Sequence, residues 1–98
     1  MIVITADFSV KKDYINDFVK LAAECTKNTK KEPGNLSYRV FAKRDDGSKF
    51  TFIEEWANDT AIEKHGESAH FKEFMAGIAS FLECEPIIKQ IVRVAEIR

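Results

Sequence analysis

The two histidines, His65 and His70, are the side chains of this sequence best suited to proton transfer near neutral pH. An imidazole has an unperturbed pKa of about 6.5, so it can accept or donate a proton under physiological conditions. His65 directly precedes Gly66, where a break in a helix could turn the ring into a cavity. A structural imidazole at a helix end is the alternative for His65, and His70, next to Phe71, is favoured as a capping or flanking residue.

The spacing of these histidines does not favour a metal site. Residues five positions apart do not share one face of a helix, and no nearby carboxylate completes a ligand set. Cys25 and Cys84 have neither CxxC spacing nor companion ligands, which predicts two ordinary thiols in a reducing compartment. We therefore expect neither a metal nor a disulfide.

Glu54 is a carboxylate among aromatic residues. Alternation along a strand places it on one face with Phe50, Phe52 and Trp56, and places Glu55 on the other face. If the aromatic face lines a pocket, loss of water would raise the pKa of Glu54. Its carboxyl group could then orient a catalytic histidine or hold a hydroxyl group of a substrate.

A purely structural role explains the same residues equally well. Glu54 could form an ion pair with Arg39 or Arg93 near a subunit interface. Trp56 and Tyr38 would form walls around a flat substrate if they line a pocket, but packing in the core accounts for both.

Charge and length limit the classes of function. The 98 residues carry 15 basic and 16 acidic side chains, so no strong positive field attracts nucleic acid or anionic lipid. No apolar run approaches the length of about 18 residues that a membrane span needs. Asp7 interrupts the apolar start, which also lacks the basic region of a signal peptide. We expect a soluble cytoplasmic protein with a single domain over residues 1–98.

Two kinds of periodicity predict the elements that hold these residues. Alternating patterns predict strands at residues 2–8, 36–43, 49–57 and 87–97, and helical patterns occupy residues 12–32 and 58–85. Pro33 and Gly34 predict a turn in which the glycine has a positive φ, and Asp46 and Gly47 favour a hairpin loop within residues 44–48. The second helical region is expected to break at Gly66 and to restart at a Ser68 cap.

The order β-α-β-β-α-β predicts an α+β protein with the ferredoxin-like fold. Two helices cover only one face of such a sheet, and the other face should be polar if the protein is a monomer. Apolar residues occur on both faces. Adjacent residues of a strand point to opposite faces, and both members of the neighbouring pairs Phe52 and Ile53, and Ile91 and Val92, are apolar. We therefore expect a homodimer in which two sheets pack face to face.

A dispersed set of positions covers nearly the whole chain and carries a family resemblance: Glu32, Pro33, Gly34, Asn35, Leu36, Tyr38, Val40, Phe52, Glu54, Trp56, Ala61, His65, Ser68, His70, Phe71 and Phe74. With these residues the chain resembles the antibiotic biosynthesis monooxygenase (ABM) domain, in its small stand-alone quinol monooxygenase form. The resemblance implies a dimeric α+β barrel, with a pocket between the sheet and the helices of each subunit.

The resemblance further implies a monooxygenase that needs no cofactor and oxidises a small quinol or related phenol with O₂. Its catalytic residues would be His65 and Glu54. The substrate would contact Tyr38, Trp56, His70, Phe71 and Phe74. Haem-degrading relatives carry a tryptophan at the position of His65 and an axial histidine at that of Met75, so haem degradation is not expected.

Three other functions remain open from the sequence. An isomerase or a binding protein for a small, possibly phosphorylated, ketone would use the same pocket without oxygen. A dimer without catalytic activity is another possibility. An RNA-binding module shares the fold, but Glu54 and Glu55 follow its aromatic strand directly and no basic stripe accompanies it, so nucleic acid is disfavoured.

Overall fold

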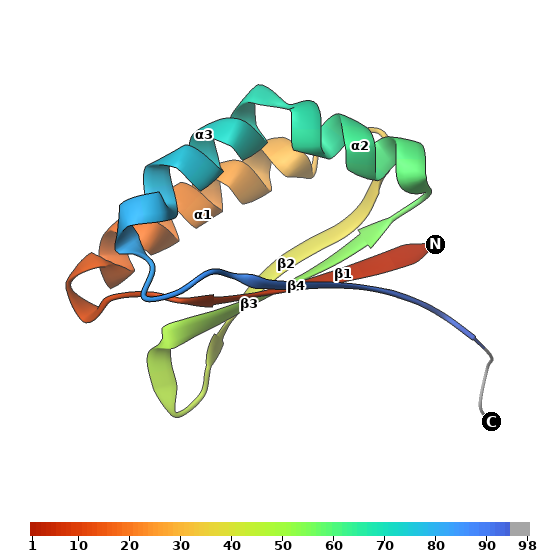
Figure 1. Ribbon diagram of the computed structural model, residues 1–98. Coiled ribbons are helices and arrows are strands. Elements are labelled where there is room, and N and C mark those ends of the chain that lie inside the picture. The colour runs from red at the N-terminus through yellow and green to blue at the C-terminus, as the bar shows by residue number, and fades with distance from the viewer. Residues whose placement is uncertain (95–98) are drawn as a thin grey trace.

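A four-stranded antiparallel sheet carries the helices on one of its faces (Figure 1). The computed structural model describes residues 1–94. The strands are β1 (Ile2–Ser9), β2 (Asn35–Lys43), β3 (Asp46–Trp56) and β4 (Ile87–Val92), and they lie in the order β2-β3-β1-β4. The helices are α1 (Ile15–Thr29), α2 (Asp59–Glu67) and α3 (Ala69–Ile78), with short 3₁₀ turns η1 (Lys12–Tyr14) and η2 (Ala79–Phe81). The predicted ferredoxin-like order is confirmed.

Aromatic side chains join the sheet to the helices. Alternation along β1 and β3 directs Phe8 and Phe52 to the same side, where their ring centroids lie 5.2 Å apart. Phe18 of α1 lies 5.7 Å from Phe8, and Phe74 of α3 lies 5.9 Å from Phe18. All four are nearly inaccessible to solvent. This packing fixes α1 and α3 over the centre of the sheet.

The break between α2 and α3 lies at Ser68 and not at Gly66, which is inside α2. The Ser68 hydroxyl donates to the carbonyl of His65 at 2.6 Å and accepts from the Phe71 amide at 3.3 Å. One side chain therefore caps the end of one helix and the start of the next. The prediction of a break at Gly66 was wrong because a helix tolerates glycine where no cap or clash requires it.

The two helix starts also differ in detail from the sequence patterns. The helical pattern predicted from residue 12 begins with the 3₁₀ turn η1, and the α-helix α1 begins three residues later, at Ile15. The second helical region, expected from residue 58, begins as α2 at Asp59, and Asn58 is its cap: the Asn58 side-chain oxygen accepts from the Ala61 amide at 2.9 Å.

The hairpin between β2 and β3 is tighter than predicted. Lys43 pairs with Asp46, which leaves Arg44 and Asp45 as the turn and puts Gly47 inside β3. The Asp46 carboxylate accepts hydrogen bonds from the Ser48 amide at 3.0 Å and from its hydroxyl at 2.5 Å. These local bonds extend β3 towards the turn.

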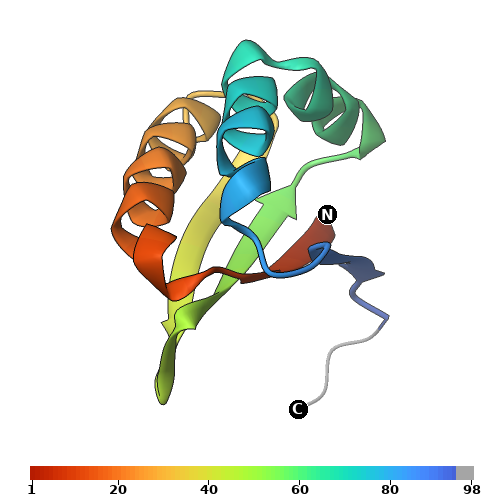
Figure 2. The same ribbon diagram turned by 60° about the vertical axis from the view of Figure 1, so that its left-hand side comes forward.

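The face of the sheet opposite the helices has no cover among residues 1–94 (Figures 1 and 2). Register places Val3 beside Ile91 on this face, with Ile53 nearby, between polar residues such as Thr5 and Lys89. Ile91 is 53% exposed. The predicted second apolar face therefore exists, interleaved with polar groups.

Strand β4 ends at Val92 and not at residue 97. Arg93 and Val94 lie outside the strand, and the rest of the predicted extension falls at residues 95–98, outside the described residues. None of the helices in residues 1–94 is both long enough and apolar enough to cross a membrane.

Gly34 is required by close packing and not by a positive φ. No residue from 1 to 94 has a positive φ, so the predicted turn conformation was wrong. A Cβ atom added to Gly34 would overlap the Cβ atom of Ala61 in α2. The Gly34 carbonyl also accepts from the Ala57 amide at 3.0 Å. The backbone of the turn after α1 therefore packs directly against the start of α2, with no room for a side chain at Gly34.

We expect Gly34→Ala to reduce the free energy of unfolding by about 1–3 kcal/mol, the usual cost of overpacking. Urea unfolding followed by circular dichroism measures this loss. Gly47→Ala is the matched control, because nothing lies within 4 Å of its added Cβ atom. Equal stability of both variants would show that the contact with Ala61 does not constrain the turn.

Candidate active site

A cavity of about 190 Å³ lies between the sheet and the pair α2 and α3. Most of its lining is apolar, and all four strands contribute: Ile4, Ala6, Phe8, Tyr38, Phe52, Glu54, Ile62, His65, Gly66, Phe71, Phe74, Met75, Ile88 and Gln90. Ile88 and Gln90 are exposed on the edge strand β4, so the cavity opens along this edge. An apolar cavity of about 150 Å³ holds benzene in another protein, so this volume suits a single-ring molecule.

Glu54 is the carboxyl group of this cavity and is only 6% exposed. Burial raises its pKa to about 7, the negative charge of Glu32 adds to the rise, and a hydrogen bond from Trp56 opposes it. That bond runs from the indole Nε1 to Glu54 Oε1 at 2.9 Å. Near neutral pH the carboxyl group is present in both forms, so it can donate or accept a hydrogen bond.

The predicted pairing of Glu54 with Arg39 does not occur. Arg39 lies on the opposite face of the sheet and approaches Glu55 at 3.7 Å. In residues 1–94 the Glu54 carboxyl group accepts a hydrogen bond from Trp56, whereas His65 contacts Glu32. The expected rise in its pKa, by contrast, agrees with the structure.

The two histidines share the carboxylate of Glu32. Its Oε2 atom lies 2.7 Å from Nδ1 of His65 and 2.8 Å from Nε2 of His70. Glu32 stands in the turn after α1, His65 in α2 and His70 in α3, so the cluster joins three segments. The expectation that no carboxylate lies near the histidines was wrong, because Glu32 comes from 33 residues upstream of His65.

His65 lines the cavity with its ring held between aromatic side chains. Its ring lies 4.7 Å from Trp56 and 4.8 Å from Phe71, centroid to centroid. Nδ1 faces the Glu32 carboxylate, which fixes the tautomer with the proton on Nδ1. In residues 1–94 no fully buried side-chain nitrogen or oxygen lacks a partner, and Nε2 has no recorded bond, so Nε2 must reach accessible space.

Burial is the main influence on the His65 imidazole and lowers its pKa, although the contact with Glu32 acts in the opposite direction. The ring is therefore mostly neutral at neutral pH. A neutral imidazole with a free Nε2 atom is suited to accept a proton.

The structure brings some of the predicted substrate-contacting residues together and not others. Tyr38, Phe71 and Phe74 line the cavity with His65 and Glu54. Trp56 is fully buried behind Glu54 and does not line the cavity, and His70 lies on the far side of Glu32. Trp56 is connected to the cavity through Glu54, and His70 through Glu32 and then His65.

Glu32 and Gln90 were not singled out as functional by the sequence patterns. Glu32 was among the residues that carry the family resemblance but was given no role, because a glutamate in a turn gives no signal of its distant partners. Gln90 lies in a strand whose six residues are all exposed, and its pairing with Ile4 of β1 and its place in the cavity lining show that it is on the helix side of the sheet.

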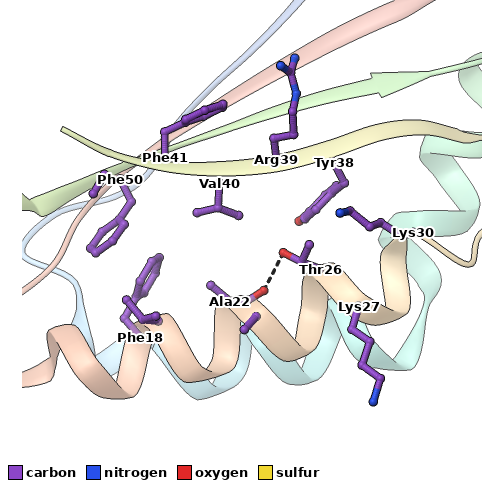
Figure 3. Close-up of a pocket in the computed structure, with 13 residues that line it drawn as sticks. Phe18, Ala22, Thr26, Lys27, Lys30, Tyr38, Arg39, Val40, Phe41 and Phe50 are labelled. Carbon is purple, nitrogen blue, oxygen red and sulfur yellow. Dashed lines mark hydrogen bonds between the residues drawn. The ribbon is translucent and has the colours of Figure 1, made fainter. Parts of the chain in front are cut away.

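A larger open groove of about 820 Å³ lies between α1 and β2 (Figure 3). Its lining is mainly apolar, with Lys27, Lys30 and Arg39 as the cations and with no carboxylate or imidazole. Tyr38 stands in the wall between the groove and the smaller cavity. Its hydroxyl lies 4.0 Å from Sγ of Cys25, and burial raises the pKa of both groups. The groups suited to acid-base chemistry are therefore in the smaller cavity.

The fold and this cavity define an α+β protein of the ferredoxin-like class, and comparison with known proteins identifies the family. Residues 1–77 match the family described as Antibiotic biosynthesis monooxygenase (ABM). The chain therefore belongs to the ABM family, as the resemblance in its sequence indicated.

Individual relatives agree with this membership. The Bacillus subtilis protein named "Putative monooxygenase YcnE" is 33% identical over 76 residues, which is 78% of this chain and 80% of that protein. An uncharacterized protein of Synechocystis sp., sll1783, is 28% identical over 95 residues, 97% of this chain and 64% of that protein. A crystal structure of an antibiotic biosynthesis monooxygenase superposes with a TM-score of 0.93 at 26% identity, covering 97% of this chain and 100% of the other.

We expect ionisation of Glu54 to destabilise the folded protein as the pH rises. Its pKa is about 7 when folded and 4.5 without these surroundings, so the folded state holds the proton more tightly. The resulting stability is complete below pH 4.5 and is lost as the pH passes 7, by about 3 kcal/mol in total.

Urea unfolding between pH 4.5 and 8 checks this, with Glu54→Gln compared with the unaltered chain. The variant should lack that part of the pH dependence. Glu55→Gln, on the other face of the same strand, should keep it. An identical pH profile for Glu54→Gln and the unaltered chain would contradict a raised pKa.

Proposed function

We propose that this protein is a cofactor-independent monooxygenase that oxidises a single-ring quinol or related phenol with O₂. The observation that carries the proposal is the place of the His65 imidazole in the wall of a small aromatic cavity, with Nδ1 held by Glu32 and Nε2 left without a hydrogen bond in residues 1–94. The family and the relative named as a monooxygenase support the class of reaction. The cavity volume supports the size of the substrate.

The residues of the cavity have separate roles in this proposal. His65 accepts the phenolic proton through Nε2, while Glu32 holds the ring in the required tautomer and stabilises its charged form. Glu54 in its protonated form donates a hydrogen bond to a second oxygen of the substrate. Phe71, Phe74 and the other apolar walls exclude water from the ring.

The reaction then follows from the substrate's own chemistry. The phenolate passes one electron to O₂, and the radical pair combines to form a C–O–O bond at a ring carbon. The O–O bond breaks as that carbon loses its hydrogen, which leaves a new C=O group and releases water. One oxygen atom enters the product, and the ring supplies the electrons that reduce the other. The proton held by His65 completes the water.

We expect His65→Gln to lower kcat by a factor of about 10² to 10⁴, the usual contribution of a positioned base. Oxygen consumption with a panel of single-ring quinols measures this. Glu32→Gln should lower kcat less, because the base is still present but no longer oriented. Glu67→Gln, an exposed carboxylate of the same helix, is the control for general effects. Full activity of His65→Gln with an intact fold would rule out His65 as the base.

An isomerase acting on a small ketone is the second candidate, and it would use the same base. The cavity disfavours a phosphorylated ketone, because no lysine or arginine is among its lining residues. An assay without oxygen separates the two candidates, since an isomerase continues to turn over and a monooxygenase stops. A protein that turns over none of these substrates would instead favour the non-catalytic alternative.

We also propose that two copies of the chain pack together through the open faces of their sheets. Apolar side chains on this face remain accessible in one chain, among them Phe41 at 46%, Ile87 at 57% and Ile91 at 53%. Their burial against a second copy would be favourable, at roughly 25 cal/mol for each Å² removed from water. Polar residues between them can pair across the interface.

Ile91→Asp should convert the dimer into a monomer, because the new charge would be buried without a partner. Light scattering at micromolar concentration measures the mass. Val19→Asp is the control, because Val19 is similarly exposed, at 47%, but lies on α1 over the other face of the sheet. A mass of one chain for the unaltered protein would refute the dimer.

A further inference from the structure

We propose that Glu32, His65 and His70 form a binding site for a single divalent transition-metal ion such as Zn²⁺. One carboxylate oxygen and two imidazole nitrogens are brought together here from three separate segments, with the three ligand atoms within 4.8 Å of one another. Two histidines and one glutamate are a common zinc ligand set, and they leave a fourth position open.

The arrangement needs only a small adjustment to hold an ion. Ligands bound at about 2.0–2.1 Å in a tetrahedral site lie about 3.3 Å from one another. Oε2 of Glu32 is already at 2.7 and 2.8 Å from the two nitrogens, so an ion would enter by moving the oxygen outwards. The two nitrogens must approach each other, and His70 is the ring with freedom to turn, because its side chain is 21% exposed against 7% for His65.

The charge of the cluster also favours a cation. The Glu32 side chain is only 14% exposed, and its recorded ion-pair partners in the described part of the chain are the two imidazoles. Two neutral imidazoles would leave the negative charge of this carboxylate uncompensated within the cluster. A divalent ion would balance that charge, and the neighbouring rings of Trp56 and Phe71 would limit competition from water.

The ligand types indicate the class of metal. Imidazole nitrogens favour Zn²⁺, Co²⁺, Ni²⁺ and Cu²⁺ over Mg²⁺ or Ca²⁺, which prefer oxygen ligands. We therefore expect micromolar or tighter binding of Zn²⁺ and no measurable response to Mg²⁺ at the same concentration.

Metal binding would switch off the proposed base, and this consequence alone rests on the proposed function. An ion on Nδ1 of His65 replaces the proton there, so the neutral ring must carry its proton on Nε2. The Nε2 lone pair, which the proposed base needs, is then lost. The site would act as an inhibitory metal site on the same residues that orient the base.

The test uses the full chain with Cys84→Ser in every sample, because the exposed Cys84 thiol could bind metal by itself. After treatment with a chelator, the protein is titrated with CoCl₂ and followed by visible absorption, and with ZnCl₂ by calorimetry. One ion should bind to each chain, and the cobalt spectrum should show the intense bands of a site with four or five ligands. The melting temperature should also rise with Zn²⁺.

Glu32→Gln and His70→Ala should each weaken Zn²⁺ binding by a factor of 100 or more. Glu67→Gln, an exposed carboxylate of α2, should leave binding unchanged. Circular dichroism confirms that each variant is folded, and Glu32→Gln, which keeps its shape, decides the matter if His70→Ala does not fold. Binding that is absent, or equal in Glu32→Gln and Glu67→Gln, would overturn the site. These measurements need no substrate, so the absence of metal binding can be distinguished from the absence of monooxygenase activity.

Discussion

One partly buried carboxylate, that of Glu32, links the parts of the structure on which the candidate site depends. It accepts a hydrogen bond from each of two imidazoles, and it stands in the turn that leads from α1 into β2. The same turn contacts α2 through Gly34, where only a hydrogen atom fits against Ala61. The position of His65 over the cavity is therefore set by a turn from elsewhere in the chain as well as by its own helix.

For two of the titratable groups that line the cavity, Glu54 and His65, the surroundings reverse the usual order of the pKa values. Burial raises the pKa of Glu54 to about 7 and lowers that of His65, since loss of water opposes the charged form of either group. Both can therefore be neutral together near pH 7. A neutral acid and a neutral base at one small aromatic cavity can hold a phenol at one oxygen and deprotonate it at another.

Membership of the ABM family establishes the architecture more firmly than the chemistry, because function depends on the residues placed on a fold. In this chain those residues are the cluster of Glu32, His65 and His70 and the pair of Glu54 and Trp56. The larger groove between α1 and β2 has more volume but no comparable pair of acid and base. Volume alone would therefore favour the groove, whereas the side chains suited to acid-base chemistry line the smaller cavity.

Local pattern determined the order of the elements, the aromatic face of β3 and the cap at Ser68, because alternation, helical period and side-chain capping act over a few residues. The same reasoning identified His65 and Glu54 as candidate groups and predicted that burial would raise the pKa of Glu54. Tertiary structure alone decided that Glu32 orients His65, that Gly34 is needed for contact with Ala61, and that Trp56 lies behind the cavity. Each of these depends on the distance between segments far apart in the chain, which no short pattern of residues records.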